Sequence, residues 1–280
     1  MNSRQIALLT GGSQQNLLRR LKRLYNSCYL DRPPIQIDYY RTGGSHPMVY
    51  ALGNRGADLL QEKYGIPRGK IDWTAKNRSL KRVFLHHTLA VSEFLIRLEA
   101  SCRKSGEIRF VGREEAQILL GNPIRTQTPF KWNVKTNFNG SPVQIGIIPD
   151  YVFGIESLKG NGGIVYYFLE VDRGTMPVVR NNLEQTSLYR KLLAYYETWR
   201  QNLHTSLFGL KRFRVIIITS NRERLNHIIA VNKLLNNDKG SGIFLLAGMP
   251  DIYSSKDIRE LPFVDGQGNE AFPLVKDTGL

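Results

Sequence analysis

Two apolar runs that carry acidic residues constrain this chain more than any other feature of its sequence. The first run covers residues 143–153 and has Asp150 inside it. The second covers residues 164–172 and includes Glu170 and Asp172. Both runs are rich in β-branched and aromatic residues, which favours strands, and the Gly-containing segment between them is typical of a turn. The simplest arrangement is a hairpin that brings Asp150 and Glu170 to a shared end or face.

These acidic residues need partners if they lie on strands. Glu170 and Asp172 are two positions apart, so their side chains point to the same face. Asp150 interrupts an apolar run, where an unpaired charge is costly. The partner is either a divalent metal ion or a basic residue, of which Arg173 is the obvious one. A metal site and a set of salt-bridged or solvated acids are therefore both open.

The order of these acids resembles the core of the PD-(D/E)XK nucleases. In that family an Asp after Pro and a Glu about twenty residues later bind Mg²⁺, and a Lys two residues after the Glu stabilises charge. The resemblance implies catalytic roles for Asp150, Glu170 and Asp172, with Mg²⁺ bound by the first two. Because Asp172 stands where the Lys is expected, the cation would come from elsewhere. Arg173 and Lys191 are the candidates.

Periodic apolar positions predict the elements around these strands. They indicate helices over residues 83–101 and 181–203 and buried strands over residues 212–220 and 243–247. The order of these elements predicts a mixed sheet flanked by helices. In the nuclease core a helical Glu ahead of the Pro-Asp strand often adds a metal ligand, so Glu93 is a third metal candidate. A surface acid is the alternative for Glu93.

Positive charge is concentrated in the front part of the chain. The whole chain has 39 Lys and Arg against 24 Asp and Glu, a formal charge of +15. Residues 1–82 hold 15 of the basic and 5 of the acidic residues, so they carry 15 − 5 = +10 of that charge. A local excess of this kind predicts a polyanionic partner, with double-stranded DNA as the leading expectation. A ribosomal or membrane-surface role gives similar numbers.

The basic front end has the pattern of a helix-turn-helix. Ser3 is predicted to cap a first short helix and Ser13 a second one. In the second helix Leu17, Leu21 and Leu24 recur at helical spacing and are expected to form the buried stripe. Two strands over 35–40 and 48–52, joined by a basic loop with glycines, would follow as a wing. The helix that precedes this pair in most winged helices is not found ahead of it.

We expect the second helix to lie in a major groove, with amides at its start near base edges and arginines near phosphates. The predicted DNA-binding residues are Gln14, Gln15, Asn16, Arg19, Arg20, Arg23 and, in the wing loop, Arg41. Two alternatives stay open: a helical module whose charges only solvate its surface, and a winged helix that contacts proteins.

The predicted fold class is α+β, with a winged helix-turn-helix followed by a mixed-sheet domain of PD-(D/E)XK type. The predicted domains are 1–66 for the winged helix, 67–82 for a basic linker and 83–280 for the nuclease-like part. The linker either follows a phosphate backbone or is a solvated tether. Two cysteines give no disulfide framework, and no membrane span or secretory signal is found, so a cytoplasmic location and no membrane partner are expected.

Taken together, the layout resembles the replication-relaxation family of plasmid and mobile-element proteins, some of which are called mobilisation protein MobC. The resemblance spans about residues 3–235. Its strings are residues 50–56 (YALGNRG), 87–91 (HTLAV), 149–150 (PD) and 168–175 (FLEVDRGT). It implies double-stranded DNA, relaxase or replication proteins as partners, and an Asp at the position of the nuclease Lys is ordinary in this family.

Three functions follow from these observations. The first is a DNA-binding accessory protein of plasmid replication or conjugative mobilisation, with a nuclease-like domain that need not be active. The second is a Mg²⁺-dependent DNA endonuclease or nickase. The third is a winged-helix transcriptional repressor whose back half only dimerises.

Overall fold

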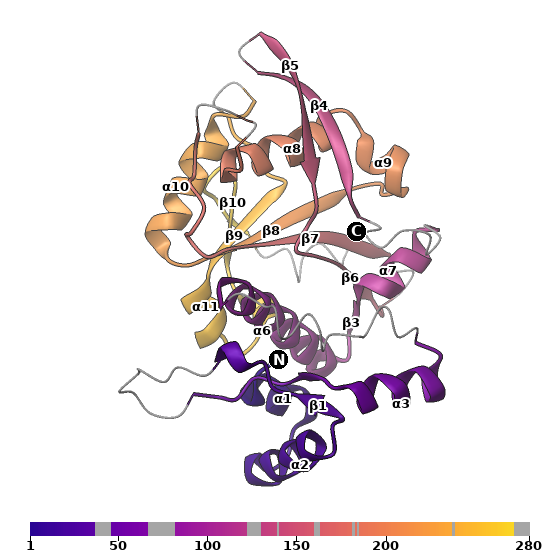
Figure 1. Ribbon diagram of the computed structural model, residues 1–280. Coiled ribbons are helices and arrows are strands. Elements are labelled where there is room, and N and C mark those ends of the chain that lie inside the picture. Colours follow the sequence, from indigo (N-terminus) through magenta and orange to yellow (C-terminus); the bar gives the residue numbers. More distant parts are fainter. Residues whose placement is uncertain are drawn as a thin grey trace. The chain divides into compact units, whose positions relative to one another are not determined.

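The protein is a mixed α+β chain made of two compact units. The computed structural model describes residues 1–36, 46–66, 82–121, 130–138, 140–159, 163–180, 183, 185–236 and 239–271. The units are Met1–Ala100 and Ser101–Leu280, so the long helix α6 begins in the first and ends in the second. N-terminal helices fill much of the first unit, and a seven-stranded mixed sheet forms the second (Figure 1). The predicted bounds of the winged helix, linker and nuclease-like part stay predictions.

The first unit is mainly helical. Its two short strands pair antiparallel, with Leu30 opposite Leu52. Its described elements are α1 (Ser3–Thr10), α2 (Gln14–Asn26), β1 (Leu30–Asp31), the 3₁₀ turn η1 (Pro34–Gln36), β2 (Ala51–Leu52), α3 (Asn54–Tyr64) and most of α6 (Arg82–Ser105).

Helix α1 is capped by Asn2, whereas the sequence pattern predicted Ser3. The Asn2 side chain accepts a hydrogen bond from the Gln5 backbone N–H, at 2.9 Å. The Gln5 side chain in turn accepts one from the Asn2 N–H, at 2.8 Å. This reciprocal pair is a capping box, which satisfies two backbone donors at once and so fixes the start one residue earlier.

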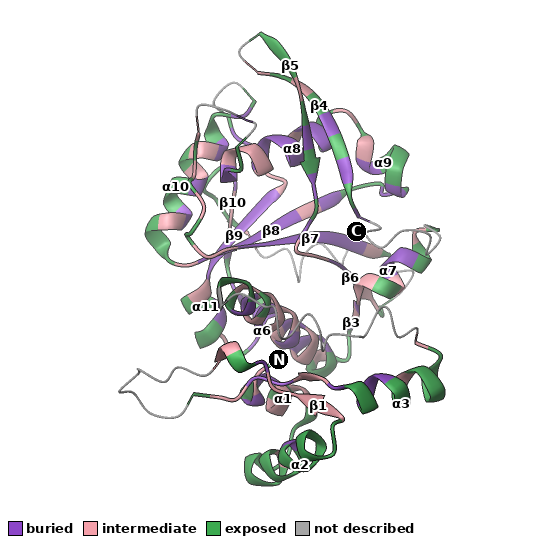
Figure 2. Cartoon of the chain, in the orientation of Figure 1, coloured by how far each residue is buried: buried purple, intermediate pink, exposed green. Residues whose placement is uncertain are grey.

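Helix α2 is far more exposed than its predicted stripe implied. Leu21 is buried, but Leu17 is only half-buried and Leu24 is 41% exposed. Figure 2 shows almost the whole helix in the colour for exposed residues. The expected buried stripe was therefore wrong at Leu24, because one helix turn rather than the whole face packs on the described part of the unit.

The predicted wing is described only in part. Within the expected strand 35–40, residues up to Gln36 belong to the turn η1, and the rest, with Arg41, lies outside the described residues. The Gln36 side chain bonds both backbone groups of Val49, accepting from its N–H and donating to its carbonyl. The two bonds from the Gln36 amide thus satisfy backbone groups of Val49 that a neighbouring strand would otherwise pair with. The predicted linker, apart from its last residue, also lies outside the described residues.

Two glycines allow α3 to start close against the preceding backbone. A Cβ on Gly53 would lie 2.4 Å from the Cys28 carbonyl oxygen, and one on Gly56 would lie 2.3 Å from that of Tyr29. Both distances are shorter than any side chain tolerates, so only glycine fits. The GNRG string at this point therefore has a packing role.

The second unit is built on a seven-stranded sheet with the order β11-β10-β9-β8-β7-β6-β3. Strands β7, β8 and β9 are parallel, and the remaining neighbours are antiparallel. The strands are β3 (Ile108–Val111), β6 (Tyr151–Ser157), β7 (Ile164–Asp172), β8 (Phe213–Thr219), β9 (Phe244–Gly248), β10 (Phe263–Asp265) and β11 (Glu270–Ala271). A separate hairpin consists of β4 (Trp132–Phe138) and β5 (Ser141–Ile147).

The predicted hairpin is confirmed, but its first run is two strands. β6 pairs antiparallel with β7, with Tyr151 opposite Leu169. The run 143–153 breaks at residues 148–150, and its first half, β5, pairs with β4. Asp150 was expected inside a strand and instead lies in the bend that leads into β6. Pro149 gives the physical reason, because proline has no N–H for a strand ladder.

Helices of the second unit cover the sheet around an aromatic core. Phe168 of β7 is fully buried and packs against Trp132 and Tyr195, with ring centroids 5.4 and 5.8 Å away. The Trp132 indole donates to the Thr198 hydroxyl, at 2.9 Å, which ties the β4–β5 hairpin to α8. The helices are α7 (Arg113–Leu119), α8 (Leu188–Arg200), α9 (Leu203–Phe208), α10 (Arg222–Lys233), α11 (Met249–Ser254) and the 3₁₀ turn η2 (Ile258–Glu260).

Helix α8 starts later than the predicted residue 181. Ser187 is its N-cap, and the Ser187 hydroxyl accepts from the Arg190 N–H. The turns that follow hold Lys191 and Tyr195, and both side chains contact Glu170 near the end of β7.

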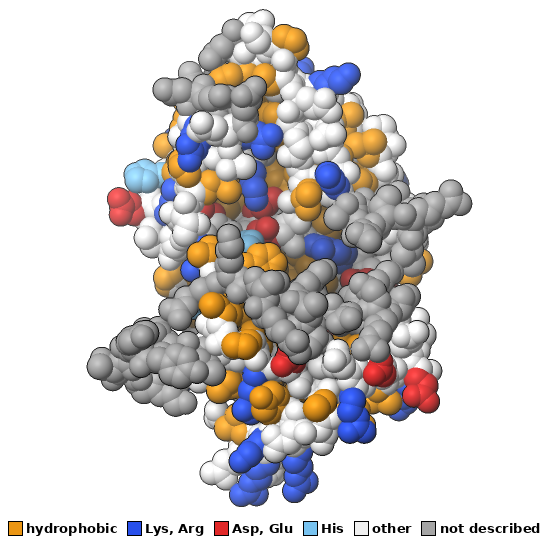
Figure 3. Space-filling view, in the orientation of Figure 1, with side chains coloured by type: hydrophobic (Ala, Val, Ile, Leu, Met, Phe, Trp, Pro, Cys, Tyr) orange, Lys and Arg blue, Asp and Glu red, His pale blue; other side chains and the backbone are white. Residues whose placement is uncertain are grey.

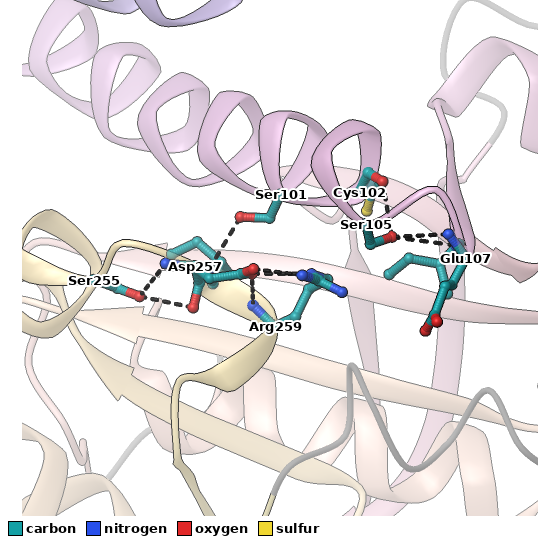
Figure 4. Close-up of polar contacts among 9 residues, drawn as sticks. Ser101, Cys102, Ser105, Glu107, Ser255, Asp257 and Arg259 are labelled. Carbon is teal, nitrogen blue, oxygen red and sulfur yellow. Dashed lines mark hydrogen bonds and ion pairs between the residues drawn. The ribbon is translucent and has the colours of Figure 1, made fainter.

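A polar cluster joins the last turns of α6 to η2 (Figure 4). The Ile258 N–H donates to the Ser101 hydroxyl, and both Asp257 oxygens accept from the Arg259 guanidinium. Burial would raise the pKa of Asp257, but the bonds from Arg259 outweigh it and hold that pKa below its ordinary value. The cluster is structural. In the part of the chain that is described, no helix is both long and apolar enough to cross a membrane.

Candidate functional site

Asp150 and Glu170 lie side by side at the end of the β6–β7 hairpin. The pairing of Tyr151 with Leu169 places the next residues outward, Asp150 and Glu170, opposite each other. An Asp150 carboxylate oxygen accepts from the Val171 N–H, at 2.8 Å. Glu170 is 3% exposed, so the strand end holds a buried carboxyl beside a second, half-buried one. The predicted meeting of these two acids is what the structure shows.

Helix α8 supplies two donors to Glu170. Lys191 Nζ lies 2.5 Å from one carboxylate oxygen, and the Tyr195 hydroxyl donates to the other at 2.7 Å. Lys191 and Tyr195 are four residues apart and so share one face of the helix. Lys191, one of the two candidate cations, thus contacts the Glu170 carboxylate directly. Tyr195 was assigned only to the packing stripe, although its helical spacing from Lys191 could have indicated this role.

The two carboxyl groups hold protons more tightly than free ones. Burial, together with the nearby Asp150 charge, raises the pKa of Glu170 to about 7, although Lys191 opposes the rise. Burial also raises the pKa of Asp150. Burial would lower the pKa of Lys191, but Glu170 and Asp150 outweigh it and raise that pKa. Burial is therefore the main cause of the raised carboxyl pKa values, and Lys191 offsets it only in part.

Arg113 is a further cation near this pair that sequence reasoning missed. Its guanidinium donates to the Asp150 carbonyl oxygen, at 2.7 Å, and lies over the Tyr151 ring, 4.6 Å from the centroid. Arg113 opens α7, a helix that the apolar pattern did not reveal. Its charge lowers the pKa of Asp150, against the larger effect of burial.

Asp172 belongs to a different cluster from Glu170. Its carboxylate accepts two bonds from the Arg224 guanidinium, at 2.7 and 3.1 Å, and one from the Thr219 hydroxyl at 3.0 Å. Arg224 comes from α10 and Thr219 from the end of β8. The predicted catalytic residue Asp172 is thus bound by an arginine in this structure, and its carboxylate joins β7 to its neighbours.

Glu93 lies in the other compact unit and has its own partners. Its two oxygens accept from the Gln5 amide, at 3.0 Å, and from Arg97 Nε, at 2.6 Å. It is 6% exposed, so it is a buried, ion-paired residue rather than a surface acid. Among the residues that the structure describes, no three His, Cys, Asp or Glu side chains lie close enough together to hold a metal ion.

The chemistry of the Asp150–Glu170 pair nevertheless fits a hard divalent cation. Mg²⁺ is usually bound by one or two carboxylates, with waters and substrate phosphates completing its shell. Burial raises the pKa of both carboxyl groups because it disfavours their ionised forms, and a bound cation would favour those forms. Asp150 and Glu170 are the residues that would hold it.

The predicted DNA-binding residues of α2 lie within the first three turns of the helix. Gln14, Gln15, Asn16, Arg19, Arg20 and Arg23 are all exposed, and none of these side chains bonds another described residue. Residues 1–30 contain five Lys or Arg and no Asp or Glu. Figure 3 shows Lys and Arg side chains gathered over this helix.

One family model matches the chain. It is described as replication-relaxation, and it matches residues 1–210. No curated protein and no solved structure is similar enough to match. The matched region includes α2 and the residues of the Asp150–Glu170 pair together with Lys191.

Proposed function

The chain belongs to the replication-relaxation family, and on that premise we propose that it is a double-stranded-DNA-binding accessory protein of plasmid replication or conjugative mobilisation. The observation that carries this proposal is the exposed α2 surface, which has basic and amide side chains and no acid. Relaxase or replication proteins are the partners that such a role implies. We propose a winged helix-turn-helix for residues 1–66 and a PD-(D/E)XK-like fold for residues 83–280.

The side chains of α2 are of the two kinds that a groove-binding helix uses, one for bases and one for phosphates. Gln14, Gln15 and Asn16 stand at its amino end, where amides can bond base edges. Arg19, Arg20 and Arg23 follow in the next turns, where guanidinium groups can bond phosphates. Because these six side chains make no bonds to the described protein, no internal interaction has to break when DNA binds.

Replacing Arg19, Arg20 and Arg23 with alanine is expected to weaken duplex binding by about tenfold or more at moderate salt. Loss of three phosphate contacts should also reduce the slope of log K against log salt by about 2.7. Fluorescence anisotropy with a labelled duplex over a salt series measures both quantities.

A matched control removes three exposed charges from the second unit, Lys131, Lys135 and Lys256. This control should change the affinity and the slope much less. If both triple variants change duplex binding equally, α2 is not the contact surface. Duplex affinity would then depend on the net charge of the protein and not on where the basic residues lie.

A second function is favoured by the meeting of Asp150, Glu170 and Lys191. These residue types match the two carboxylates and the lysine of the PD-(D/E)XK core, with the lysine supplied by α8. A bound Mg²⁺ would supply Lewis-acid stabilisation of a scissile phosphate in a metal-dependent endonuclease or nickase. Lys191 would favour the ionised form of Glu170 through its direct ion pair, against the opposing effect of burial on that pKa, and would neutralise part of the local charge.

This second function predicts cleavage of supercoiled plasmid in Mg²⁺ or Mn²⁺. Asp150→Asn and Glu170→Gln keep the shapes of the side chains but remove ligand charge, so both should abolish cleavage. Agarose-gel separation of supercoiled, nicked and linear plasmid gives the result. Asp251→Asn, an exposed acid elsewhere in the unit, serves as the control. Absence of cleavage by the unsubstituted protein with either metal would remove the enzymatic function and leave the DNA-binding one.

A further inference from the structure

A cavity of about 420 Å³ lies in the second unit, away from the acidic pair. Val165 near the start of β7, Phe213 at the start of β8 and Ile243 just before β9 line it. These are the amino ends of the three parallel strands, whereas Glu170 lies near the carboxyl end of β7. The cavity and the acidic pair are therefore at opposite ends of the same strands.

Two aromatic side chains of α8 form one wall of this cavity. Tyr196 and Trp199 have ring centroids 6.1 Å apart and ring planes inclined by 33°. Trp199 is 46% exposed, and its indole N–H has no partner among the described residues. Large aromatic surface left open beside a cavity is available to another planar group.

Two arginines line the same cavity, and no acidic side chain does. Arg212 is exposed and makes no hydrogen bond or ion pair to any described residue. Arg214 is half-buried and donates to the Gly242 carbonyl oxygen, at 3.1 Å. Without an acid in its lining, the cavity disfavours cationic ligands and favours a ligand that is both planar and anionic.

We propose that this cavity binds an unpaired nucleotide within a single strand of nucleic acid. The base would lie against Trp199 and Tyr196, and its phosphate would be bound by Arg212. Aromatic platforms beside basic groups are how proteins bind single strands with little sequence preference, because every base has a π face. The volume is within the range of ordinary ligand pockets.

The cavity residues differ from the α2 residues to which the proposed duplex binding is assigned. Helix α8 links the two ends of the strands, because Lys191 and Trp199 are eight residues apart, about 12 Å along its axis. Processes that open a duplex produce the single strands that such a cavity would take. The protein would then contact paired and unpaired regions through separate surfaces.

The affinity test uses the full chain and a fluorescein-labelled oligothymidylate, followed by anisotropy. Trp199→Ala and Arg212→Ala are each expected to weaken binding by about tenfold. Trp199→Phe retains an aromatic face and should recover most of the affinity. Lys211→Ala removes the same charge one residue away, from an exposed side chain outside the cavity lining, and should change affinity by less than about twofold.

A second measurement locates the base directly. A strand containing 5-bromodeoxyuridine, irradiated in the complex, should crosslink to the segment of α8 that contains Tyr196 and Trp199, as mapped by mass spectrometry. The variant that lacks Arg19, Arg20 and Arg23 should give the same crosslink. The experiments therefore distinguish a loss of duplex binding by α2 from a loss of single-strand binding by the cavity.

Three outcomes would overturn the inference. The first is unchanged affinity in Trp199→Ala with crosslinks outside α8. The second is an equal loss in Lys211→Ala and Arg212→Ala, which would reduce the effect to net charge. The third is competition by free thymidine monophosphate as strong as by the oligonucleotide, which would assign the cavity to a small nucleotide instead of a strand.

Discussion

Replacing Arg224 with methionine is expected to lower the free energy of unfolding by about 3–5 kcal/mol, because it leaves the Asp172 carboxylate buried without its cation. The side chains of Arg224 and Asp172 are only 14% and 7% exposed, and the guanidinium bonds both carboxylate oxygens. Urea denaturation followed by circular dichroism measures the change. Arg222→Met, on an exposed position of the same helix, should change stability by less than about 0.5 kcal/mol.

A double variant separates a structural role of Asp172 from a functional one. Asp172→Leu combined with Arg224→Met replaces the ion pair by two apolar groups, which is often neutral relative to the intact pair. We expect the double variant to recover most of the stability that the single variant loses. If Arg224→Met proves harmless to stability, the ion pair does not fasten β7 to α10, and Asp172 becomes available again as a candidate ligand.

The second large effect is a fall in stability between about pH 4.5 and pH 7 in the presence of a chelator. Glu170 has a pKa of about 7 in the folded chain and 4.5 as a model value, so the folded state binds its proton more tightly within this window. The protonated Glu170 contributes its full stabilisation of the fold below the unfolded-state pKa. This contribution to the free energy of unfolding is lost as pH rises through the folded-state pKa, and the difference between the two pKa values corresponds to about 3 kcal/mol. The raised pKa of Asp150 acts in the same direction.

Denaturation midpoints at a series of pH values measure this dependence. Glu170→Gln cannot ionise, so its stability should vary much less across the window. Glu223→Gln, an exposed acid on α10, should keep the dependence of the unsubstituted protein. A Glu170→Gln variant with the same slope as the unsubstituted protein would show that this carboxyl does not titrate near neutrality. Adding Mn²⁺ in place of the chelator should reduce the slope only if the acidic pair binds the ion.

The sequence located the acidic pair because strand pairing follows simple local rules. Two runs of β-branched and aromatic residues with a turn between them favour a hairpin, and the positions of Asp150 and Glu170 in those runs make them meet. The sequence could not show that the first run, residues 143–153, forms two separate strands, β5 and β6. Both halves have the same apolar character, and only the pairing of β5 with β4 separates them.

The cations of the site are less predictable than its acids. Lys191 was one of two candidates, and only the packing of α8 selected it for Glu170. Arg224 and Thr219 lie 52 and 47 residues from Asp172 in the chain, so no local pattern could pair them with it. Tyr195 had the apolar spacing of a core residue. Its hydroxyl donates to Glu170 only because α8 packs against β7 in the core.

Local propensity and charge were enough to predict the β6–β7 hairpin and the excess of positive charge in residues 1–82, because neither depends on contacts between distant segments. The pairing of each acid with its cation, the exposure of α2 and the cavity beside α8 became visible only in the folded chain. Those features depend on contacts between segments far apart in the chain, which a single sequence does not specify without the packing of its core.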